Sequence, residues 1–177
     1  MHRLFVAIRP PEPVREQLLD LMEGMAEARW QTEDQLHLTL RFIGEVDGRL
    51  AADIDTALSA VRHPPFQLAL DGLGAFNRRG QPAALWAGVA PHEALKTLHK
   101  KIDHGLQRAG LAPERRAYLP HITLARFGRG GASLQPLLAR AGGITSAPFP
   151  VTEFRLYESC LTPTGAEYAP IARYSLA

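Results

Sequence analysis

The sequence has one cysteine, Cys160, in 177 residues. A single thiol cannot form a disulfide within the chain, which excludes a disulfide-stapled scaffold and favours a reducing compartment. The apolar run near the N-terminus covers only residues 4–8, whereas a membrane-spanning helix needs roughly 20 apolar residues. We therefore expect a cytoplasmic protein with no membrane partner.

Lysine is also scarce. Among the 20 basic residues, only Lys96, Lys100 and Lys101 are lysine, and the remainder are arginine. A guanidinium group grips phosphate through two parallel hydrogen bonds, but genomic base composition explains the same bias. The net charge of +2 and the isoelectric point of about 8.9 permit an anionic partner without requiring one.

Several catalytic motifs are absent. The chain has no His-Glu-x-x-His segment and no cluster of carboxylates, although a catalytic zinc site usually takes three protein ligands. The glycine-rich segment at residues 128–131 lacks the Lys-Ser/Thr pair that completes a phosphate-binding loop. We therefore predict no metal site and no hydrolysis of nucleoside triphosphates.

Hydrophobic periodicity predicts a mixture of strands and helices in the order β-α-β-α-ββ-α-β-α-ββ. Such a mixture, with hairpins, indicates an α+β fold with largely antiparallel sheets in a single domain over residues 1–177. The predicted strands are residues 4–8, a short strand near Trp30, and residues 35–42, 66–70, 83–89, 121–127, 149–158 and 168–174. The predicted helices are residues 14–29, 50–61, 91–109 and 133–140. A loop is predicted over residues 74–83, because this segment is rich in Gly, Asn and Pro.

One eight-residue segment occurs twice with small changes. It reads QLHLTLRF at residues 35–42 and PHITLARF at residues 120–127, so that His37 and His121 are 121 − 37 = 84 residues apart. Side chains alternate between the two faces of a strand. In each copy the histidine and the threonine, His37 with Thr39 and His121 with Thr123, therefore share a face, and the leucines pack behind them. The duplication suggests two similar halves that face each other across a cleft.

Two histidines on opposite sides of a substrate can divide proton transfer between them. One imidazole takes a proton from the nucleophile and the other gives a proton to the leaving group. Threonine hydroxyls can donate hydrogen bonds to oxygens that gain negative charge in the transition state. A phosphodiester needs both functions, so this pattern favours phosphodiester chemistry over a structural role for the two histidines.

The repeated His-x-Thr-x segments resemble those of the two-histidine phosphoesterase superfamily. The flanking segments RLFVAIRPP, WQTEDQLHLTLRFIGEV, GLGAFNRRGQPAALWAGV and VTEFRLYESCLTPTGAEYAPI make nearly the whole chain similar to the bacterial and archaeal RNA 2′,3′-cyclic phosphodiesterases, also called 2′-5′ RNA ligases. The resemblance implies a bilobal fold of two pseudo-symmetric antiparallel-sheet lobes, with outer helices, around a central cleft.

The same resemblance implies a reaction and its residues. The expected activity is hydrolysis of an RNA 3′-terminal 2′,3′-cyclic phosphate to a 2′-phosphomonoester, without metal or cofactor. His37 is expected to be the proton donor and His121 the proton acceptor. Thr39, Thr123 and Arg126 are expected to bind the phosphate. Strict alternation places Arg126 on the other face of the strand from His121, so phosphate binding by Arg126 needs a twist or bulge in the strand. Without one, Arg126 has a purely structural role.

Five further residues are candidate RNA contacts. Arg41 is expected on the face of His37, within reach of the RNA backbone. Alternation turns Phe42 away from His37, either into the core or toward a base at the end of the strand. Phe76, Arg78 and Arg79 combine an aromatic ring with two charges, although a solvated loop explains them as well.

Other functions remain open at this point. The same site run in reverse joins RNA ends through a 2′-5′ linkage. The alternatives are a non-catalytic RNA-binding module, and a phosphodiesterase acting on 2′-5′ oligonucleotides or small cyclic nucleotides. A monomer is expected, because no large unexplained apolar stripe is present.

Overall fold

The computed structural model describes all residues, from Met1 to Ala177. Four α-helices and nine β-strands follow one another along the chain, with one short 3₁₀ turn, η1. Their bounds are β1 His2–Ile8, α1 Glu12–Leu21, β2 Ala28–Trp30, η1 Glu33–Gln35, β3 Leu38–Val46, α2 Gly48–Ser59, β4 Phe66–Arg78, β5 Gln81–Ala90, α3 Glu93–Arg108, β6 His121–Phe127, α4 Gln135–Ala141, β7 Phe149–Val151, β8 Glu153–Thr162 and β9 Gly165–Ser175. The predicted α+β class is confirmed.

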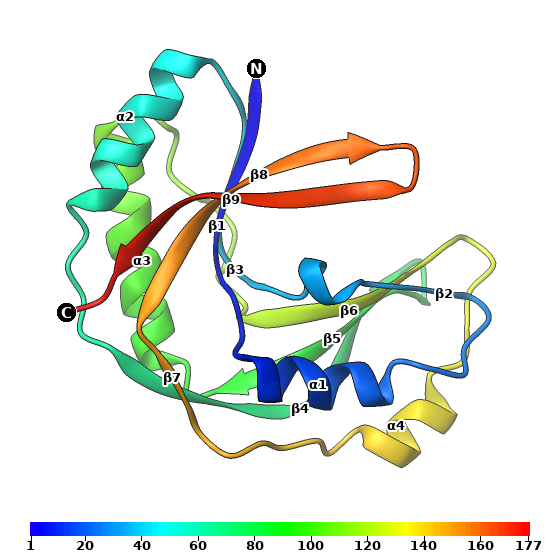
Figure 1. Cartoon of the computed structure of the whole chain (residues 1–177). Helices are drawn as coiled ribbons and strands as arrows, with labels where there is room; N and C mark the ends of the chain where they lie inside the picture. The colour runs from blue at the N-terminus through cyan, green and yellow to red at the C-terminus, as the bar shows by residue number, and fades with distance from the viewer.

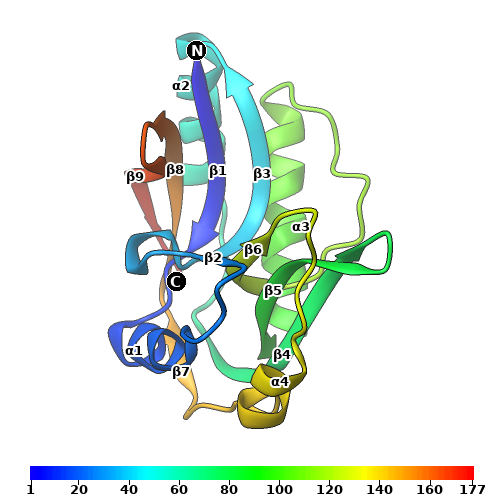
Figure 2. The same ribbon diagram turned by 90° about the vertical axis from the view of Figure 1, so that its right-hand side faces the viewer.

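The strands form an antiparallel sheet in the order β7-β4-β5-β6-β3-β1-β8-β9, and β2 pairs with β6. The strands that carry the repeated segment, β3 and β6, are neighbours in the middle of this order. They are joined by a single residue pair, Leu38 with Ile122. Figure 2 shows one group of strands around β1 and β3 and another around β4, β5 and β6, which meet at this junction. The predicted arrangement of two antiparallel halves is therefore confirmed.

The helices pack on the sheet with the apolar stripes that the sequence predicts. On α3, the side chains of Leu95, Leu98, Ile102 and Leu106 are completely buried, and this helix packs against β3 and α2. In Figure 1, α2 and α3 lie side by side along the left of the molecule, and α1 and α4 lie along the bottom. No helix has both the length and the apolar character that crossing a membrane requires.

Two element boundaries differ from the prediction near the first copy of the repeat. The first helix ends at Leu21, eight residues early, because the chain turns at Gly24 with a φ of +80°, which favours glycine. The strand predicted from Gln35 begins only at Leu38. Gln35 belongs to η1, where its side-chain Oε1 accepts a hydrogen bond of 3.0 Å from the backbone N–H of Thr32.

The loop predicted over residues 74–83 is too long, although the segment does contain the turn that its composition indicated. Strands β4 and β5 continue through most of it and form a long hairpin whose turn is only Arg79 and Gly80. Both turn residues have positive φ angles, 52° for Arg79 and 77° for Gly80, as in the two-residue turn that matches the twist of paired strands. Gly80 therefore marks a tight hairpin turn, whereas Asn77 and Pro82 are paired residues of β4 and β5.

The pairing of β3 with β1 shifts twice, at Leu40 and again at Ile43, and the first shift affects the repeated segment. Thr39 pairs with Ala7 of β1, but the next pair joins Arg41 with Val6, so Leu40 is an extra residue. This β-bulge reverses the alternation. Leu40 and Arg41 are consequently both buried, and the residue after them, Phe42, faces the side opposite to the one predicted.

The second copy breaks at the equivalent point. Ala125 of β6 pairs with Leu85 of β5, but the next pair joins Thr123 with Trp86, so Leu124 is the extra residue. Leu124 and Ala125 are both completely buried. The bulges lie three residues after each histidine, so the two halves repeat an irregular feature of the backbone as well as a short sequence.

Candidate active site

The register between β3 and β6 brings the two histidines to one place. Leu38 faces Ile122 in an antiparallel pair. Continued by one residue in each direction, this register puts His37 opposite Thr123 and Thr39 opposite His121. Residues directly opposite each other on neighbouring strands have Cβ atoms about 5 Å apart and share a face. The four polar side chains therefore form one cluster, in which each imidazole has the hydroxyl of the other copy as its neighbour across the strands.

Both imidazoles are held in the same orientation. The Nδ1 atom of His37 lies 2.7 Å from the carbonyl oxygen of Gln35, and that of His121 lies 2.7 Å from the carbonyl oxygen of Leu119. A carbonyl oxygen only accepts hydrogen bonds, so each Nδ1 carries the proton and donates it. In the neutral ring the Nε2 lone pair is then free, and this is the atom that can exchange a proton with a substrate.

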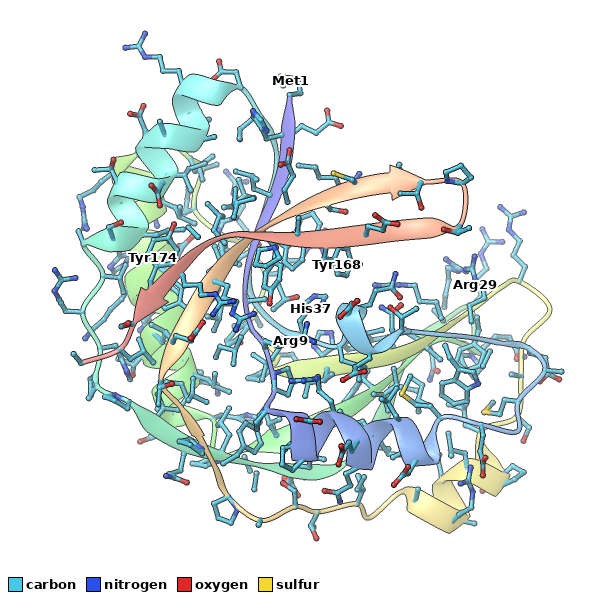
Figure 3. The ribbon with its side chains drawn as sticks, in the orientation of Figure 1. Met1, Arg9, Arg29, His37, Tyr168 and Tyr174 are labelled. Atoms are coloured by element: carbon cyan, nitrogen blue, oxygen red, sulfur yellow. The ribbon has the colours of Figure 1, made fainter.

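Aromatic rings surround His37. The ring centre of Phe5 lies 4.9 Å from the imidazole centre, and that of Tyr168 lies 5.3 Å away with its plane perpendicular. Figure 3 shows Tyr168 next to His37. The ring of Tyr157 stacks on Phe5 at 5.2 Å. The hairpin of β8 and β9 that carries the tyrosines is tied to η1, because Gln35 donates a hydrogen bond of 2.7 Å to the carbonyl of Ala166. These contacts exclude water from one side of His37.

His121 has a different and more open environment. The ring of Phe76 meets its imidazole edge-on at 4.9 Å, and Trp86 lies at 6.1 Å. The indole of Trp86 crosses β4 at Gly74, where a Cβ atom would lie 2.3 Å from the ring, so this close approach requires glycine. Trp86 Nε1 is a buried nitrogen without a hydrogen-bond partner.

The surroundings disfavour the protonated form of both imidazoles, because they lower the pKa of each ring. Burial lowers the pKa of His37 from 6.5 to about 4, with smaller effects of the same sign from the charges of His121 and Arg126, against the Gln35 carbonyl, which raises it. Burial also lowers the pKa of His121, as does the charge of Arg126, while the Leu119 carbonyl raises it. Between about pH 4 and 6.5 the unfolded chain therefore binds more protons at His37 than the folded protein, so this group makes the fold less stable as the pH falls through that window.

Arg126 lies beside this cluster because of the bulge in β6. Its exposed guanidinium group lies on the side of His121 and Thr123, and its charge acts on both imidazoles. It makes no ion pair with a carboxylate of the chain. The sequence left two interpretations of Arg126 open: a bulge that turns it toward the histidines, or a structural role. The structure contains the bulge, and the guanidinium group is unpaired beside the histidines.

Arg41 is not on the face of His37, so this prediction is wrong. The bulge turns its side chain into the interior, where only 8% of the residue is exposed. Its Nε donates to Asp103 Oδ1 at 2.8 Å, and its other nitrogens donate to the carbonyls of Phe42 and Ala112. Burial alone would raise the pKa of Asp103, but hydrogen bonds from Arg41, the backbone of Glu114 and Gln107 lower it below its usual value. Arg41 joins β3 to α3 and does not face a ligand.

Phe42 also lies on the opposite face of the strand from the one that strict alternation predicts. It lies on the side of His37 with 49% of its surface exposed, so the core position is excluded. Its ring is nearly parallel to that of Phe5, 6.1 Å away, and the guanidinium of Arg3 lies 5.8 Å from its centre. Phe42 corresponds to Arg126 in the second copy, so equivalent positions carry an aromatic ring and a positive charge.

The remaining predicted residues lie on the β4–β5 hairpin. Phe76 contacts His121, as described, and has 37% of its surface exposed. Arg78 and Arg79 lie farther out, at the end of the hairpin, and line a hollow with Arg129. The structure thus brings Phe76 to the histidines and leaves Arg78 and Arg79 at the rim.

Sequence reasoning missed several residues of this site. Phe5, Trp86, Tyr157 and Tyr168 come from strands far apart in the chain, and no local pattern marks them. The bulges did leave a signal: in the second copy the apolar residues are at positions 122, 124, 125 and 127, a spacing that changes phase at one point. No group of three or more His, Cys, Asp or Glu side chains is placed to hold a metal ion.

Comparison with known proteins agrees with this geometry. The family model described as the 2′-5′ RNA ligase superfamily matches residues 9–160. The chain belongs to this superfamily.

Relatives of similar length share about a third of the sequence. An RNA 2′,3′-cyclic phosphodiesterase of Aeropyrum pernix is 36% identical over 77% of this chain and 79% of its own. The protein of the same name from Escherichia coli is 32% identical over 98% of this chain and 96% of its own. A Geobacillus stearothermophilus relative, 36% identical, is longer, and the matched part spans 47% of it.

Solved structures of the superfamily show the same fold. The crystal structure of E. coli LigT complexed with 3′-AMP has a TM-score of 0.84 and 30% identity to this chain, and covers 99% of it and 98% of LigT. The structure of TT0787 of Thermus thermophilus has the same TM-score of 0.84, with 28% identity over 98% and 97% of the two chains. The bilobal α+β fold implied by the sequence resemblance is therefore confirmed.

The buried ion pair predicts a stability effect. Arg41→Met leaves the Asp103 carboxylate buried without its cation, and we expect the free energy of unfolding to fall by about 3–5 kcal/mol. In the double variant Arg41→Met/Asp103→Leu no unpaired charge remains, so most of this loss should be recovered. Urea denaturation measures all three proteins. A single variant as stable as the original protein would contradict the assignment of Arg41 to the interior.

The charge of Arg126 predicts a shift in both histidines. In Arg126→Gln the positive charge that disfavours imidazolium is absent, so the pKa of His37 and of His121 should rise. Proton NMR titration of the imidazole C–H resonances measures this. Arg49→Gln, a change on the surface of α2, is the matched control and should leave both midpoints unchanged. Unshifted midpoints in Arg126→Gln would mean that the guanidinium does not face the histidines.

Proposed function

We propose that this protein hydrolyses the 2′,3′-cyclic phosphate at the 3′ end of RNA to a 2′-phosphomonoester, by metal-independent acid–base catalysis. The observation that carries this proposal is the β3–β6 register, which places two imidazoles and two hydroxyls on one face with both Nε2 atoms free. The relatives described above bear the name of this activity, and LigT is known in complex with 3′-AMP.

The reaction needs one proton removed and one proton supplied. His121 accepts a proton from water at Nε2 while the water oxygen forms a bond to phosphorus. The bond between phosphorus and the 3′ oxygen breaks, and His37 donates the proton on its Nε2 to that oxygen. The 2′ ester remains, His121 ends protonated and His37 neutral, and exchange with solvent restores the starting state.

Three side chains are suited to hold the phosphate oxygens. The hydroxyls of Thr39 and Thr123 flank the imidazoles and donate hydrogen bonds to the oxygens that are not transferred. The guanidinium of Arg126 supplies positive charge on the same face. Phe42, exposed beside Phe5 and His37, offers a flat surface to the terminal base.

The lowered pKa values have a consequence for the proton donor. His37 is neutral in the free protein near neutral pH, because burial lowers its pKa and disfavours imidazolium. A bound phosphodiester carries a negative charge next to the ring, and an opposite charge raises the pKa of the imidazole. Substrate binding therefore favours protonation of His37, so the protonation of this residue is coupled to substrate binding.

The two halves of one chain supply one histidine each, which supports a single two-lobed domain over residues 1–177 that acts as a monomer. We further propose that it acts in the cytoplasm. In reverse, a 5′-hydroxyl in place of water would yield a 2′-5′ linkage, as a minor reaction. The superfamily name supports this alternative. A non-catalytic RNA-binding module, or a phosphodiesterase of 2′-5′ oligonucleotides, would retain the basic surface but not turn over a cyclic phosphate end.

We predict that His37→Ala and His121→Ala each lower turnover by about 10²–10⁴-fold, since each removes one proton-transfer step. The assay uses RNA with a 2′,3′-cyclic phosphate end in the presence of EDTA, and follows the 2′-phosphate product. His104→Ala, which changes an exposed histidine on α3, is the control and should keep full activity. Activity that survives both substitutions would refute the mechanism, and activity lost on adding EDTA would point to a metal.

The pH dependence provides a separate test. The profile of kcat/KM reports the free protein and that of kcat reports the complex with substrate. We expect both profiles to be bell-shaped, and the kcat profile to lie at higher pH, because the bound anion raises the pKa of both imidazoles. Initial rates from about pH 4 to 9 measure this, a range that brackets the usual histidine pKa. Coincident profiles would mean that the substrate charge does not reach the histidines.

A further inference from the structure

Five exposed arginines lie along the edge of the molecule that extends beyond His121. They come from four segments, and none of them makes an ion pair or a side-chain hydrogen bond to another residue of the chain, unlike Arg9, Arg15, Arg41 and Arg155. They are Arg29 on β2, Arg78 and Arg79 on the β4–β5 hairpin, Arg126 on β6, and Arg129 after β6.

The strand register places two of these arginines, Arg126 and Arg29, on the histidine face. Arg126 pairs directly with Arg29 of β2 on one side and with Ala84 of β5 on the other. Figure 3 shows Arg29 at the end of the molecule away from α2 and α3. Like charges directly opposite each other on neighbouring strands are destabilising. Their juxtaposition leaves uncompensated positive charge on this part of the sheet, which a bound anion would neutralise.

The face of the sheet that carries the histidines continues from Ala84 to the tip of the β4–β5 hairpin. Ala84 pairs with Phe76, and after a bulge Arg78 pairs with Gln81. Arg78 is two residues after Phe76 in β4, so both point to the same face. A continuous path therefore leads from His121, past the ring of Phe76, to the arginines at the end of the hairpin.

A hollow of about 430 Å³ ends this path. It contains no carboxylate, and three of its six residues are arginine. The lining consists of Arg78, Arg79, Gln81, Pro82, Gly128 and Arg129. We call this the arginine hollow.

The backbone at Arg79 supports a ligand-binding role. Its φ of 52° lies in the left-handed region, which disfavours residues with a long side chain by about 1–2 kcal/mol and suits Gly or Asn. A charged residue in this conformation is retained at the expense of turn stability. Strained residues of this kind concentrate at binding and catalytic sites.

We propose that the arginine hollow binds a backbone phosphate of the RNA chain, several nucleotides away from the reacting end. Phe76 stacks on a base between that phosphate and the reacting end. This inference rests on the proposed function. The hollow begins at Gly128, five residues after Thr123. One of these five, Leu124, is the extra residue of the bulge, so the distance corresponds to about four residues, or roughly 13 Å at about 3.2–3.4 Å per residue. A single nucleotide held at the histidines does not reach that far, so the protein prefers an oligonucleotide to a mononucleotide.

The chemistry of the path favours single-stranded RNA over other anions. An aromatic ring between two groups of arginines is the arrangement that binds a strand by stacking and by charge, without reading its sequence. Free phosphate would occupy the arginine hollow but would gain nothing from Phe76. The contribution of the hollow should therefore depend on the length of the chain and on the salt concentration.

The test compares two substrates and one set of variants. The variant Arg78→Gln/Arg79→Asn/Arg129→Gln removes three charges, and asparagine suits the left-handed turn, so the hairpin should fold at least as well. We expect kcat/KM to fall for a hexanucleotide with a 2′,3′-cyclic phosphate end, mainly through KM. It should stay within about twofold for the 2′,3′-cyclic mononucleotide, whose phosphate meets only the histidine cluster.

Salt dependence gives a magnitude. Neutralising one phosphate of a single strand contributes a slope of about 0.7 to the fall of log kcat/KM with log salt, which corresponds to about 2.6-fold between 50 and 200 mM. This steepness should be lost in the variant. The control Arg49→Gln/Lys100→Gln/Arg108→Gln removes the same charge from α2 and α3 and should keep it.

Binding of a fluorescent RNA that ends in a 3′-hydroxyl separates this inference from the proposed function. Anisotropy titrations should show weaker binding to the variant than to the control, even if no substrate were turned over. Failure of the original protein to hydrolyse either substrate would overturn the proposed function. Equal RNA affinity for variant and control, or equal loss for mononucleotide and hexanucleotide, would overturn the arginine hollow as an RNA site. Competition by inorganic phosphate as effective as by RNA would do the same.

Discussion

One pair of residues, Leu38 with Ile122, joins the two halves of the sheet and determines the geometry of the site. Both side chains are buried, so the register cannot slip by one residue without turning leucine and isoleucine out of the core and histidine into it. The buried surface behind the strands therefore holds the catalytic face in front of them. Hydrophobic packing, and not a polar network, places the two imidazoles on the same face of the sheet.

The bulges add what a regular strand could not supply. In a regular strand, the residue five positions after the histidine faces the core. With one extra residue, Phe42 and Arg126 lie beside the imidazoles. In the first copy the distorted backbone is supported by polar contacts: His99 Nδ1 donates to the carbonyl of Leu40 at 2.6 Å and the Tyr118 hydroxyl donates to the carbonyl of Thr39 at 3.0 Å.

The support of β3 comes from elements that follow β5. His99 and Asp103 are on α3, and Tyr118 lies just before β6, yet all three hold the strand of the other half. The rings of His99 and Tyr118 are stacked at 4.2 Å, so helix and loop act together. Each half therefore depends on the other for its active conformation, which is a physical reason for the halves to act as one unit.

Apolar spacing and strand alternation in the sequence correctly predicted those parts of the structure that depend only on neighbouring residues in the chain. The bounds of β6 and the stripe of α3 follow from apolar spacing, and the shared face of His121 and Thr123 follows from alternation within two residues. Arg41 and Phe42 were predicted wrongly because they lie beyond the bulge. A bulge is a property of two paired strands, and the partner of Arg41, Asp103, is 62 residues away. The aromatic surroundings of His37 likewise depend on the pairing of β1 with β3 and β8, which a single sequence does not reveal.

The distribution of charge matters more here than its sum. A net charge of +2 is nearly neutral for a chain of this size, and predicts little about partners. Carboxylates neutralise Arg9, Arg15, Arg41 and Arg155, whereas the five arginines that gather beyond His121 have no such partners. Field lines from this unneutralised group extend into solvent along one edge and raise the local concentration of a polyanion there. The two halves thus repeat the same catalytic element but differ in what surrounds it: aromatic rings that exclude water near His37, and open positive charge near His121. Such a division suits a substrate whose reacting end must be dry while the rest of its chain remains in solvent.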